Sequence, residues 1–576
     1  MTMTSVSLAL TGSGGAGVMT AGQILVDAAA QAGWYGLMGR SLGPQIRGGE
    51  SAALLRLSPA PVQSPDDFYD LMVAVDWGNI DRFASELPLR AASVIVTDPS
   101  QGEVPAVMLR ASPHVVPVPL KDIAKDVPAG RVNMVALGLI AAAIGLPEDA
   151  VVGVLRQVLA KKGADALDAS VASLRAGAVH AAALQGVPTL APPTRSPAER
   201  WSITGNEAAG VGALRGGVRF CAAYPITPAT EVLEWLAPNL AKLGGTLVQA
   251  EDELASITMC LGGSFGGVPS LTATSGPGLA LMTEALGLGV ASETPVVVVD
   301  VMRGGPSTGI PTKSEQSDLN IAVYGLHGDA PHVVTAPTSI ADCLFTTQWS
   351  VYLAESLQVP VILLSDQAMG QTRAIIDKPA DAPFVGHRLI ATASDGAPYQ
   401  RYAVTADGIS PMAVPGTPGG EYTADGLEHS PRGTPSTQAQ HHEDQLDKRL
   451  RKLTAFDYGD AWAHLETFGK AATDLAVITF GSVTQPVREA LGRAAEAGVS
   501  CRLIAPRLLF PAQPARMAAA LSGIKRLLVV EQNHMAQFHA LLRAYYDLPP
   551  NVKTLHRPGP LALRPHEIVA ALGDWS

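Results

Sequence analysis

Cysteine is scarce in this sequence of 576 residues. The cysteines lie far apart, and no pair has the C-x-x-C spacing that zinc and iron–sulfur ligands commonly show. They are Cys221, Cys260, Cys343 and Cys501. We therefore expect no iron–sulfur cluster and no metal site held by this chain alone. Isolated thiols in a large chain are typical of a reducing compartment.

Long apolar runs and a basic charge balance are also missing. No uninterrupted apolar run reaches the roughly 18 residues that a transmembrane helix needs. The N-terminus lacks a basic segment followed by an apolar stretch and a cleavage site, so we expect a cytoplasmic protein without membrane association. The formal net charge of −11 argues against nucleic acid as the main partner.

The composition favours large buried sheets, because 47% of the residues are apolar and only 16% are charged. The length predicts several domains, since one domain takes roughly 100–200 residues. Strand-like apolar segments alternate with helical patterns, which predicts a multidomain α/β fold. Examples of these segments are Ala52–Leu57, Leu71–Val75, Thr246–Gln249 and Arg526–Glu531.

A glycine-rich turn lies between an apolar strand, Ser5–Leu10, and a helical pattern over Val18–Ala32. Its spacing matches G-x-G-x-x-G, which lets phosphate oxygens approach the free N–H groups of a helix N-terminus. The glycines of the motif are Gly12, Gly14, Gly15 and Gly17. The alternative is a tight turn that binds nothing.

The residues after this helix indicate which phosphate ligand is favoured. In dinucleotide-binding turns, an acidic residue about 20 positions further on binds the ribose. Residues 39–49 instead contain Arg40 and Arg47 and no carboxylate, and Glu50 comes later than the motif expects. NAD is therefore disfavoured, and a ligand with several phosphates is favoured.

Polar residues follow strand-like segments in the middle of the chain, and in open α/β sheets ligands bind at such strand ends. Glu251 closely follows a strand, whereas Asp252 and Glu253 are expected in the first turn of a helix, where carboxylates usually interact only with the helix dipole. Thr227 precedes Pro228 and is expected to be a helix N-cap, or to hold a carboxylate together with the helix N-terminus.

Arg303 follows the apolar segment Pro295–Val299. An arginine at such a position needs a partner, and its planar guanidinium suits a bidentate carboxylate. The alternative is an ion pair with Glu251, Asp252 or Asp300. The loop Gly304–Lys313 is rich in glycine, serine and threonine, so it is able to wrap closely around an anionic ligand.

Residues 379–455 are polar and rich in glycine and proline, and they contain His429, His441 and His442. The spacing of these histidines fits no common zinc site, so we expect them to be loop histidines. Long irregular stretches are often functional loops or linkers. We expect an irregular arm that packs on a partner subunit.

Three motifs, in this order, resemble those of the 2-oxoacid:ferredoxin oxidoreductases. They are Tyr224–Pro228, Gln249–Glu251 and Arg303–Gly309. The likeness covers nearly the whole chain and is greatest to α subunits that act on 2-oxoglutarate and carry a γ domain fused to the N-terminus. Ala229 departs from the serine that the family often has at this position.

The resemblance implies thiamine diphosphate as cofactor, with Glu251 contacting N1′ of its aminopyrimidine as a general acid–base. It also implies that Thr227 and Arg303 hold the 2-oxoacid carboxylate and that Tyr224–Pro225 contributes to the cofactor site. Lys313 is a candidate for the distal carboxylate of 2-oxoglutarate. Coenzyme A would contact the N-terminal glycine turn, with Arg40 and Arg47.

The resemblance also implies a division into domains. A Rossmann-like γ domain that contacts coenzyme A would span residues 1–186, and a linker residues 187–200. A pyrimidine-binding α domain would span residues 201–378, the arm residues 379–455, and a transketolase C-terminal-like domain residues 456–576.

The Gly-Asp-Gly motif with which thiamine enzymes hold diphosphate and Mg²⁺ is missing, because Gly328–Ala330 and Gly573–Trp575 both lack the second glycine. A β subunit is therefore expected to supply the diphosphate site, Mg²⁺ and a [4Fe-4S] cluster that passes electrons to ferredoxin. Thiamine enzymes of this kind hold the cofactor between subunits, so we expect a heterotetramer of two α and two β subunits.

The residues alone leave other functions open. One is an NAD(P)- or flavin-linked dehydrogenase built on the glycine turn, and another is a non-catalytic protein that binds coenzyme A or an acyl carrier. Within the family, pyruvate or a branched-chain 2-oxoacid is the alternative to 2-oxoglutarate.

Overall fold

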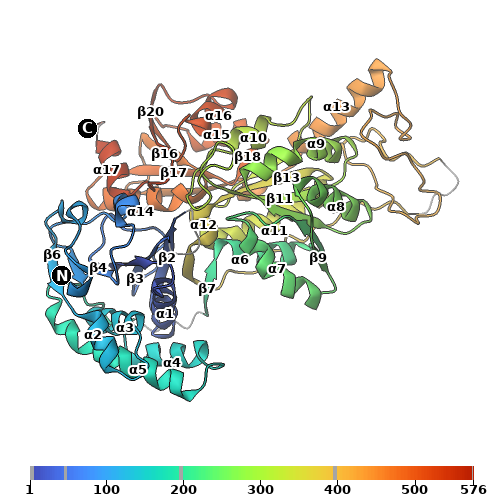
Figure 1. Cartoon of the computed structure of the whole chain (residues 1–576). Helices are drawn as coiled ribbons and strands as arrows, with labels where there is room; N and C mark the ends of the chain where they lie inside the picture. The colour runs from blue at the N-terminus through green and yellow to red at the C-terminus, as the bar shows by residue number, and fades with distance from the viewer. Residues whose placement is uncertain (1–4, 44–48, 194–198, 393–397, 574, 576) are drawn as a thin grey trace. The chain divides into compact units, whose positions relative to one another are not determined.

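The computed structural model describes residues 5–43, 49–193, 199–392, 398–573 and 575. The chain divides into two compact units, each assembled from segments that are far apart in the sequence (Figure 1). The first unit comprises Met1–Thr204, Gln371–Pro379 and Pro560–Ala570. The second comprises Gly205–Gly370, Ala380–Gly559 and Ala571–Ser576.

The first unit is built on one sheet. Its strands are β1 (Val6–Ser13), β2 (Tyr35–Leu42), β3 (Glu50–Ser58), β4 (Leu71–Ala74), β5 (Val94–Thr97), β6 (His114–Pro117), β7 (Arg200–Thr204) and β14 (Arg373–Asp377), in the order β6-β5-β4-β1-β3-β2-β14-β7. The strands from β6 to β1 are parallel, as in a Rossmann-like fold, and those from β1 to β7 are antiparallel.

The antiparallel half of this sheet differs from the predicted alternation of strands and helices. β2 and β3 pair directly with each other, with Arg40 opposite Ala53. β2 was not expected, because it contains Gly36 and Gly39, and glycine is a poor strand former. β7 and β14, which lie at the two ends of the region expected to form the α domain, extend the same sheet.

Side chains alternate between the two faces of this sheet, as the strand period requires. Val6, Leu8 and Leu10 of β1 belong to one buried cluster, and Ala9 belongs to another. Helices pack on the first of these clusters. The helices of this unit include α1 (Val18–Gln31), α2 (Leu120–Asp126), α3 (Val132–Ile144), α4 (Glu148–Val158), α5 (Ala164–Ala178) and most of α17 (Pro565–Gly573).

The second unit contains a sheet with the order β18-β12-β13-β11-β10-β8-β9. Its strands are β8 (Phe220–Ala223), β9 (Thr246–Gln249), β10 (Ser270–Thr274), β11 (Val296–Met302), β12 (Val333–Thr335), β13 (Pro360–Asp366) and β18 (Leu508–Phe510). All neighbours are parallel except β12 and β18. β11 and β13 are buried along their whole length, which explains their nearly continuous apolar sequences.

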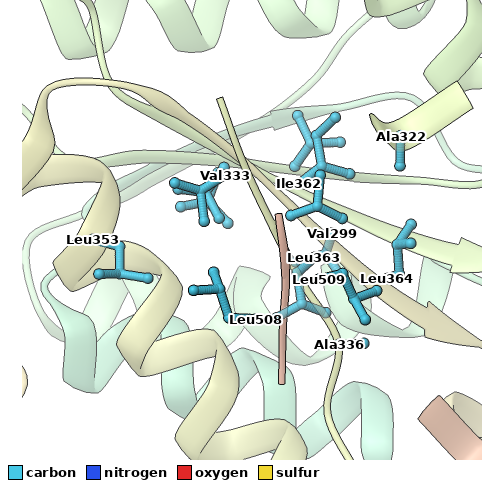
Figure 2. Packing of buried hydrophobic residues seen from close by; sticks show 14 of the residues in the cluster. Val299, Ala322, Val333, Ala336, Leu353, Ile362, Leu363, Leu364, Leu508 and Leu509 are labelled. Carbon is cyan, nitrogen blue, oxygen red and sulfur yellow. The ribbon is translucent and has the colours of Figure 1, made fainter. Parts of the chain in front are cut away.

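Helices α6 (Gly205–Gly216), α7 (Thr230–Lys242), α8 (Glu253–Phe265), α9 (Gly276–Ala291), α10 (Leu319–Tyr324), α11 (Ile340–Leu357) and the short α12 (Gln367–Gln371) connect these strands or flank them. Figure 2 shows part of the hydrophobic core around this sheet. Leu508 and Leu509 of β18 lie among Val333 of β12, Ile362 of β13 and Leu353 of α11 (Figure 2). A strand near the C-terminus therefore completes the core of the middle part of the chain.

The C-terminal part of the second unit has its own sheet, with the order β15-β17-β16-β19-β20. Its strands are β15 (Ala463–Phe468), β16 (Leu475–Thr479), β17 (Cys501–Pro506), β19 (Arg526–Glu531) and β20 (Asn551–His556). The helices near it are α14 (Thr484–Glu496), α15 (Pro514–Ala520) and α16 (Gln537–Tyr545). All its strand pairs are parallel except that of β15 with β17.

The expected irregular arm contains one long helix, α13 (Ala439–Thr454), after a largely irregular stretch from residue 380. The prediction of an arm without regular structure is therefore wrong over α13. This helix is strongly charged, and several of its polar side chains are nevertheless buried. Burial of Gln445, Lys448 and Lys452 shows that the helix packs on its own chain.

Candidate active site

Polar segments follow the ends of neighbouring parallel strands in the second unit, as predicted. β8 lies between β9 and β10, and β10 lies between β8 and β11. The registers place Ala223 beside Gln249 and Thr274 beside Asp300, so the carboxyl ends of these strands meet at one edge of the sheet. Ligands of open parallel sheets bind at such edges.

Thr227 does not cap the following helix, so the prediction of an N-cap is wrong. The turn before the helix is held by backbone hydrogen bonds, since Ala229 N and Thr230 N both donate to Ile226 O, at 2.8 and 3.0 Å. α7 begins at Thr230, with Ala229 in the N-cap position. The Thr227 side chain is exposed and is left available for a ligand.

The consecutive carboxylates after β9 take different positions. Asp252 is the N-cap of α8, and its carboxylate accepts a hydrogen bond from Ala255 N at 2.7 Å. Glu253 is buried against the start of α9, where a Cβ at Gly278 would lie 2.7 Å from Glu253 Cγ. Glu251 is exposed just before the helix, and within the described residues its side chain makes no hydrogen bond or ion pair. It is therefore the carboxylate that is free to meet a ligand.

Arg303 directly follows β11, and its side chain is largely buried. Its Nη1 donates to Thr227 O at 2.5 Å, and its Nε has no partner within the described residues. The alternative of an ion pair with Glu251, Asp252 or Asp300 is not found in the described part of the chain. Burial lowers the pKa of the guanidinium, while Asp318 and Asp300 oppose this shift.

Two aspartates lie near Arg303: the buried Asp300, expected from the sequence only as an alternative ion-pair partner, and the half-buried Asp318, which was missed. Asp300 is an inner residue of β11, and Asp318 precedes α10. Within the described residues, both carboxyl oxygens of Asp300 and Oδ2 of Asp318 have no hydrogen-bond partner. Burial raises the pKa of Asp300 well above its usual value, and the Asp318 charge adds to this effect. Burial also raises the pKa of Asp318 to about 6. The feature of the sequence that could have drawn attention to this site is Asp300, an aspartate inside the otherwise apolar stretch Val296–Met302.

The loop after Arg303 folds back on itself. Gly304 N donates to Lys313 O at 3.0 Å, and Ile310 N donates to Gly304 O at 2.8 Å. Gly309 has a positive φ of 54°, and a Cβ there would lie only 1.7 Å from Gly304 O, so this position requires glycine. Residues 305–310 are exposed at the tip, and Lys313 is half-buried at the base.

The glycine turn of the first unit borders a cavity of about 610 Å³. Gly17, with a φ of 81°, is the N-cap residue of α1, and a Cβ there would lie 2.4 Å from Asn133 Nδ2. Basic groups of Lys121, Arg131 and Lys162 also line the cavity. Bare backbone next to several cations suits a ligand with phosphate groups.

The other predicted ligand residues near this turn lie differently. Gly15 lines the cavity, whereas Gly12 lies at the end of β1. Arg40 is part of β2 and donates to Gln371 Oε1 at 3.3 Å, so it lies in a strand and not in a loop. Arg47 lies outside the described residues. Sequence reasoning missed Lys121 and Arg131, because they follow the turn by more than 100 positions.

The arm histidines have separate surroundings. His429 is buried and stacks on Tyr402 with a ring-centroid distance of 4.1 Å. His441 Nδ1 is 2.8 Å from Ser436 Oγ, and His442 Nδ1 is 2.8 Å from a Glu428 oxygen. Over the described ranges, no group of histidine, cysteine and acidic side chains is arranged to hold a metal ion. In the same ranges, no helix is long and apolar enough to cross a membrane.

Comparison with known proteins assigns the class. Residues 211–448 match the thiamine-diphosphate-binding family of pyruvate flavodoxin/ferredoxin oxidoreductases, and residues 7–179 match the pyruvate ferredoxin/flavodoxin oxidoreductase family. The α subunit of 2-oxoacid:ferredoxin oxidoreductase 2 from Aeropyrum pernix is 30% identical, over 96% of both chains. The chain belongs to the 2-oxoacid:ferredoxin oxidoreductase family, whose members are thiamine-diphosphate-dependent enzymes.

Two further proteins are similar over large parts of their length. The 2-oxoglutarate synthase subunit KorA of Methanothermobacter marburgensis is 35% identical, over 64% of this chain and 98% of its own. A solved structure of 2-oxoglutarate:ferredoxin oxidoreductase from Magnetococcus marinus, with 2-oxoglutarate, coenzyme A and succinyl-CoA bound, is 36% identical with a TM-score of 0.91 over 99% of both chains. The predicted family resemblance and multidomain α/β fold are confirmed, and the dehydrogenase and non-catalytic alternatives are set aside.

Proposed function

We propose that this chain is the α subunit of a 2-oxoglutarate:ferredoxin oxidoreductase. The enzyme would convert 2-oxoglutarate, coenzyme A and oxidised ferredoxin to succinyl-CoA, CO₂ and reduced ferredoxin, reversibly. The observation that carries this proposal is the likeness, over 99% of both chains, to a structure that was solved with 2-oxoglutarate, coenzyme A and succinyl-CoA bound. Pyruvate and branched-chain 2-oxoacids are the alternative substrates, and the activity assay described below distinguishes them from 2-oxoglutarate.

Glu251 fits the aminopyrimidine end of thiamine diphosphate, because it is exposed at a strand end and is not used as a helix cap. When bound, this cofactor supplies the carbanion that adds to the 2-oxo carbon. The role of Glu251 is to hold and exchange a proton with N1′ as a general acid–base. Tyr224, which is 40% exposed just after β8, and Pro225 would line the same part of the site.

Arg303 and Thr227 would bind the carboxylate next to the reacting carbon. The Arg303 side chain already donates to Thr227 O, and its Nε remains without a partner in the described residues, so donors are left for an anion. The exposed Thr227 hydroxyl adds a further donor. Lys313, at the base of the loop after Arg303, is proposed for the distal carboxylate of 2-oxoglutarate.

Coenzyme A would occupy the cavity at the glycine turn, with Lys121, Arg131 and Lys162 facing its phosphates. This assignment extends the predicted set of Gly12, Gly14, Gly15, Gly17, Arg40 and Arg47. The phosphates would meet backbone N–H groups at the start of α1 and cationic side chains around the cavity, and both favour anions. In this proposal, the γ-like domain that contacts coenzyme A spans residues 1–186.

The remaining domain and partner assignments are part of the same proposal. A pyrimidine-binding domain spans residues 201–378 and a transketolase C-terminal-like domain residues 456–576, separated by the arm at 379–455. A β subunit carries the diphosphate site, Mg²⁺ and [4Fe-4S], and two α and two β subunits form a cytoplasmic heterotetramer that reduces ferredoxin. Support comes from the subunit names of the relatives, which describe α subunits of larger enzymes.

The substrate is tested on the natively isolated complex under anaerobic conditions. Viologen reduction is followed with 2-oxoglutarate, pyruvate and 2-oxoisovalerate, each with and without coenzyme A. The highest kcat/KM with 2-oxoglutarate, together with a requirement for coenzyme A, supports the proposal. A preference for pyruvate overturns the substrate assignment, and a complex without any 2-oxoacid-dependent reduction overturns the proposed reaction.

Two variants test the residue roles. Glu251→Gln should lower kcat by about 100-fold or more, the usual worth of a general acid–base, while Glu234→Gln on the exposed face of α7 should not. Arg303→Ala should raise the KM of the 2-oxoacid more than that of coenzyme A. A change in the coenzyme A constant alone would show that the carboxylate binds elsewhere.

A further inference from the structure

A segment of the chain lies across the carboxyl edge of the C-terminal sheet. β16, β19 and β20 are parallel neighbours, and their carboxyl ends are paired side by side. Ligands of open α/β sheets usually bind outside this edge. Here residues 314–317 of the same chain make hydrogen bonds to it. This segment directly follows Lys313, at the base of the loop after Arg303.

Gln316 makes the central contacts of this segment, and its side chain is fully buried. Its Nε2 donates to Phe480 O, just after β16, at 2.8 Å. Its Oε1 accepts from Gln532 N, just after β19, at 2.8 Å, and its backbone N donates to Gln532 O at 2.7 Å. A Cβ at Gly481 would lie 2.5 Å from Gln316 Nε2, so the carboxamide packs closely on bare backbone.

Both neighbours of this glutamine are held in the same way. Glu315 Oε2 accepts from Gly559 N, shortly after β20, at 3.1 Å. Gln537, at the start of α16, donates from Nε2 to Ser317 O at 2.9 Å, and its Oε1 accepts from Asn320 N at 2.9 Å. The segment is therefore fixed to the ends of β16, β19 and β20 and to the helix that follows β19.

The loop of residues 304–313 is held at both of its ends. Before it lies β11, which is buried along its whole length, and after it lies the fixed segment 314–317. The backbone of Lys313 closes the loop, because Gly304 N donates to Lys313 O at 3.0 Å and Lys313 N donates to Ile310 O at 3.1 Å. The position of Lys313 therefore depends on the C-terminal sheet, which comes more than 140 positions later in the sequence.

We propose that Gln316 and Gln537 are positioning residues that hold Lys313 where it binds the distal carboxylate of a 2-oxo dicarboxylate. The C-terminal sheet thereby sets the preference of the enzyme for such substrates. The inference rests on the proposed role of Lys313 in substrate binding. Gln316 is fully buried, so it acts through the backbone of the segment and not by contact with the substrate. Because the attraction between two charges weakens with distance, a displaced Lys313 weakens binding of the distal carboxylate selectively.

The experiment compares two substrates with the same carbon skeleton on the natively isolated complex. 2-Oxoglutarate and 2-oxopentanoate differ only at the far end, where a methyl group replaces the carboxylate. Viologen reduction with saturating coenzyme A gives kcat/KM for each, and the ratio of the two values measures the preference for the dicarboxylate. In Gln316→Ala we expect this ratio to fall by about tenfold or more, while kcat/KM for 2-oxopentanoate and the KM of coenzyme A change little.

A double-mutant cycle shows whether the glutamine acts through the lysine. Lys313→Met removes the charge itself and should lower the ratio at least as much as Gln316→Ala. Combining the two substitutions should lower it no further, because residues that act as one unit are not additive. Gln537→Ala should lower the ratio in the same direction, and it carries the test if Gln316→Ala does not assemble. Gln358→Ala is the matched control and should keep the wild-type ratio, because Gln358 is also fully buried but donates to Ser410 O of the arm, at 2.9 Å.

Failure of the inference and failure of the proposed function give different results. An unchanged ratio in Lys313→Met shows that this lysine does not bind the distal carboxylate, and the inference falls with that assignment. A lowered ratio in Lys313→Met, together with a wild-type ratio in the folded glutamine variants, overturns the inference alone. Equal losses for both substrates, or an additive fall in the double variant, indicate a general structural role and also overturn it. Co-purification of the partner subunit shows which variants are folded.

Discussion

A buried ion cluster connects α13 of the arm to the rest of the second unit. Glu293, just after α9, is fully buried. Its carboxylate oxygens lie 2.5 Å from Lys448 Nζ and 3.1 Å from Lys452 Nζ, both on α13. Arg401 Nη2 donates to Glu293 O at 2.8 Å. The carboxylate of Glu293 therefore pairs with two buried lysines, and its backbone carbonyl binds Arg401.

The cluster has one carboxylate and more than one cation, so the free-energy cost of removing the carboxylate should differ from that of removing one lysine. Glu293→Gln leaves both lysines and Arg401 buried without their anion, and such a loss costs roughly 3–5 kcal/mol. Lys448→Met removes the hydrogen bonds of Lys448 Nζ to Glu293 and, at 2.8 Å, to Ser410 Oγ, but it leaves Glu293 paired with Lys452, so no buried charge loses its only counterion. The glutamine variant should therefore be the more damaging, although it is the more conservative in shape.

The assay is amide hydrogen exchange, because a chain with two compact units does not give one unfolding free energy. Exchange of the α13 amides in Glu293→Gln should accelerate more than in Lys448→Met, while the strands of the first unit stay unchanged. Leu450→Ala, at a residue that is 50% exposed on the same helix, serves as the control and should have little effect. Equal protection of α13 in the wild type and in Glu293→Gln would refute the reasoning.

Gly278, Arg131 and Glu293 each allow a further test. Gly278→Ala should destabilise the second unit by about 1–3 kcal/mol, because the new Cβ would lie 2.0 Å from Thr274 Oγ1. Gly287→Ala, with its nearest atom at 3.6 Å, should be tolerated. Amide hydrogen exchange of α9 in both variants checks this. Arg131→Ala should raise the KM for coenzyme A about tenfold or more and leave that of the 2-oxoacid unchanged in steady-state assays. Burial raises the pKa of Glu293, but the charges of Lys452, Lys448 and Arg401 outweigh burial and hold this pKa well below its usual value of 4.5. The contribution of Glu293 to stability is therefore complete above that pH and is lost on acidification, and protection of α13, followed by hydrogen exchange, should fall below about pH 4.5.

Local sequence patterns located many of the strands. Thr246–Gln249 and Arg526–Glu531 are strands with the predicted bounds, and Ala52–Leu57 lies within β3. These segments are short and apolar, and they are bounded by turn residues, so local preference and burial agree. The glycine turn was also identified, since a positive φ at Gly17 has a direct sequence signature.

Pairing across long distances was not predictable in this way. The alternation of strands and helices suggested parallel strands, but β2 and β3 pair antiparallel, and β14 joins β2 from more than 300 positions away. The helical signal of α13 was hidden by its charge, because the buried lysines of this helix are compensated by Glu293, which lies about 150 positions earlier. Such partners come together only in the folded chain.

The order of residue types along the chain already contains the chemical groups of the site: a carboxylate, a threonine and an arginine at successive strand ends, and bare glycine backbone at a helix start. How each group is used depends on the folded structure. It made Asp252 a cap and left Glu251 exposed, and it released Thr227 from capping. It also buried Asp300 inside β11, where its carboxyl oxygens have no hydrogen-bond partner in the described residues. The reason is physical: spacing along the chain fixes residue type and local conformation, whereas burial and charge balance depend on neighbours that the fold brings from elsewhere.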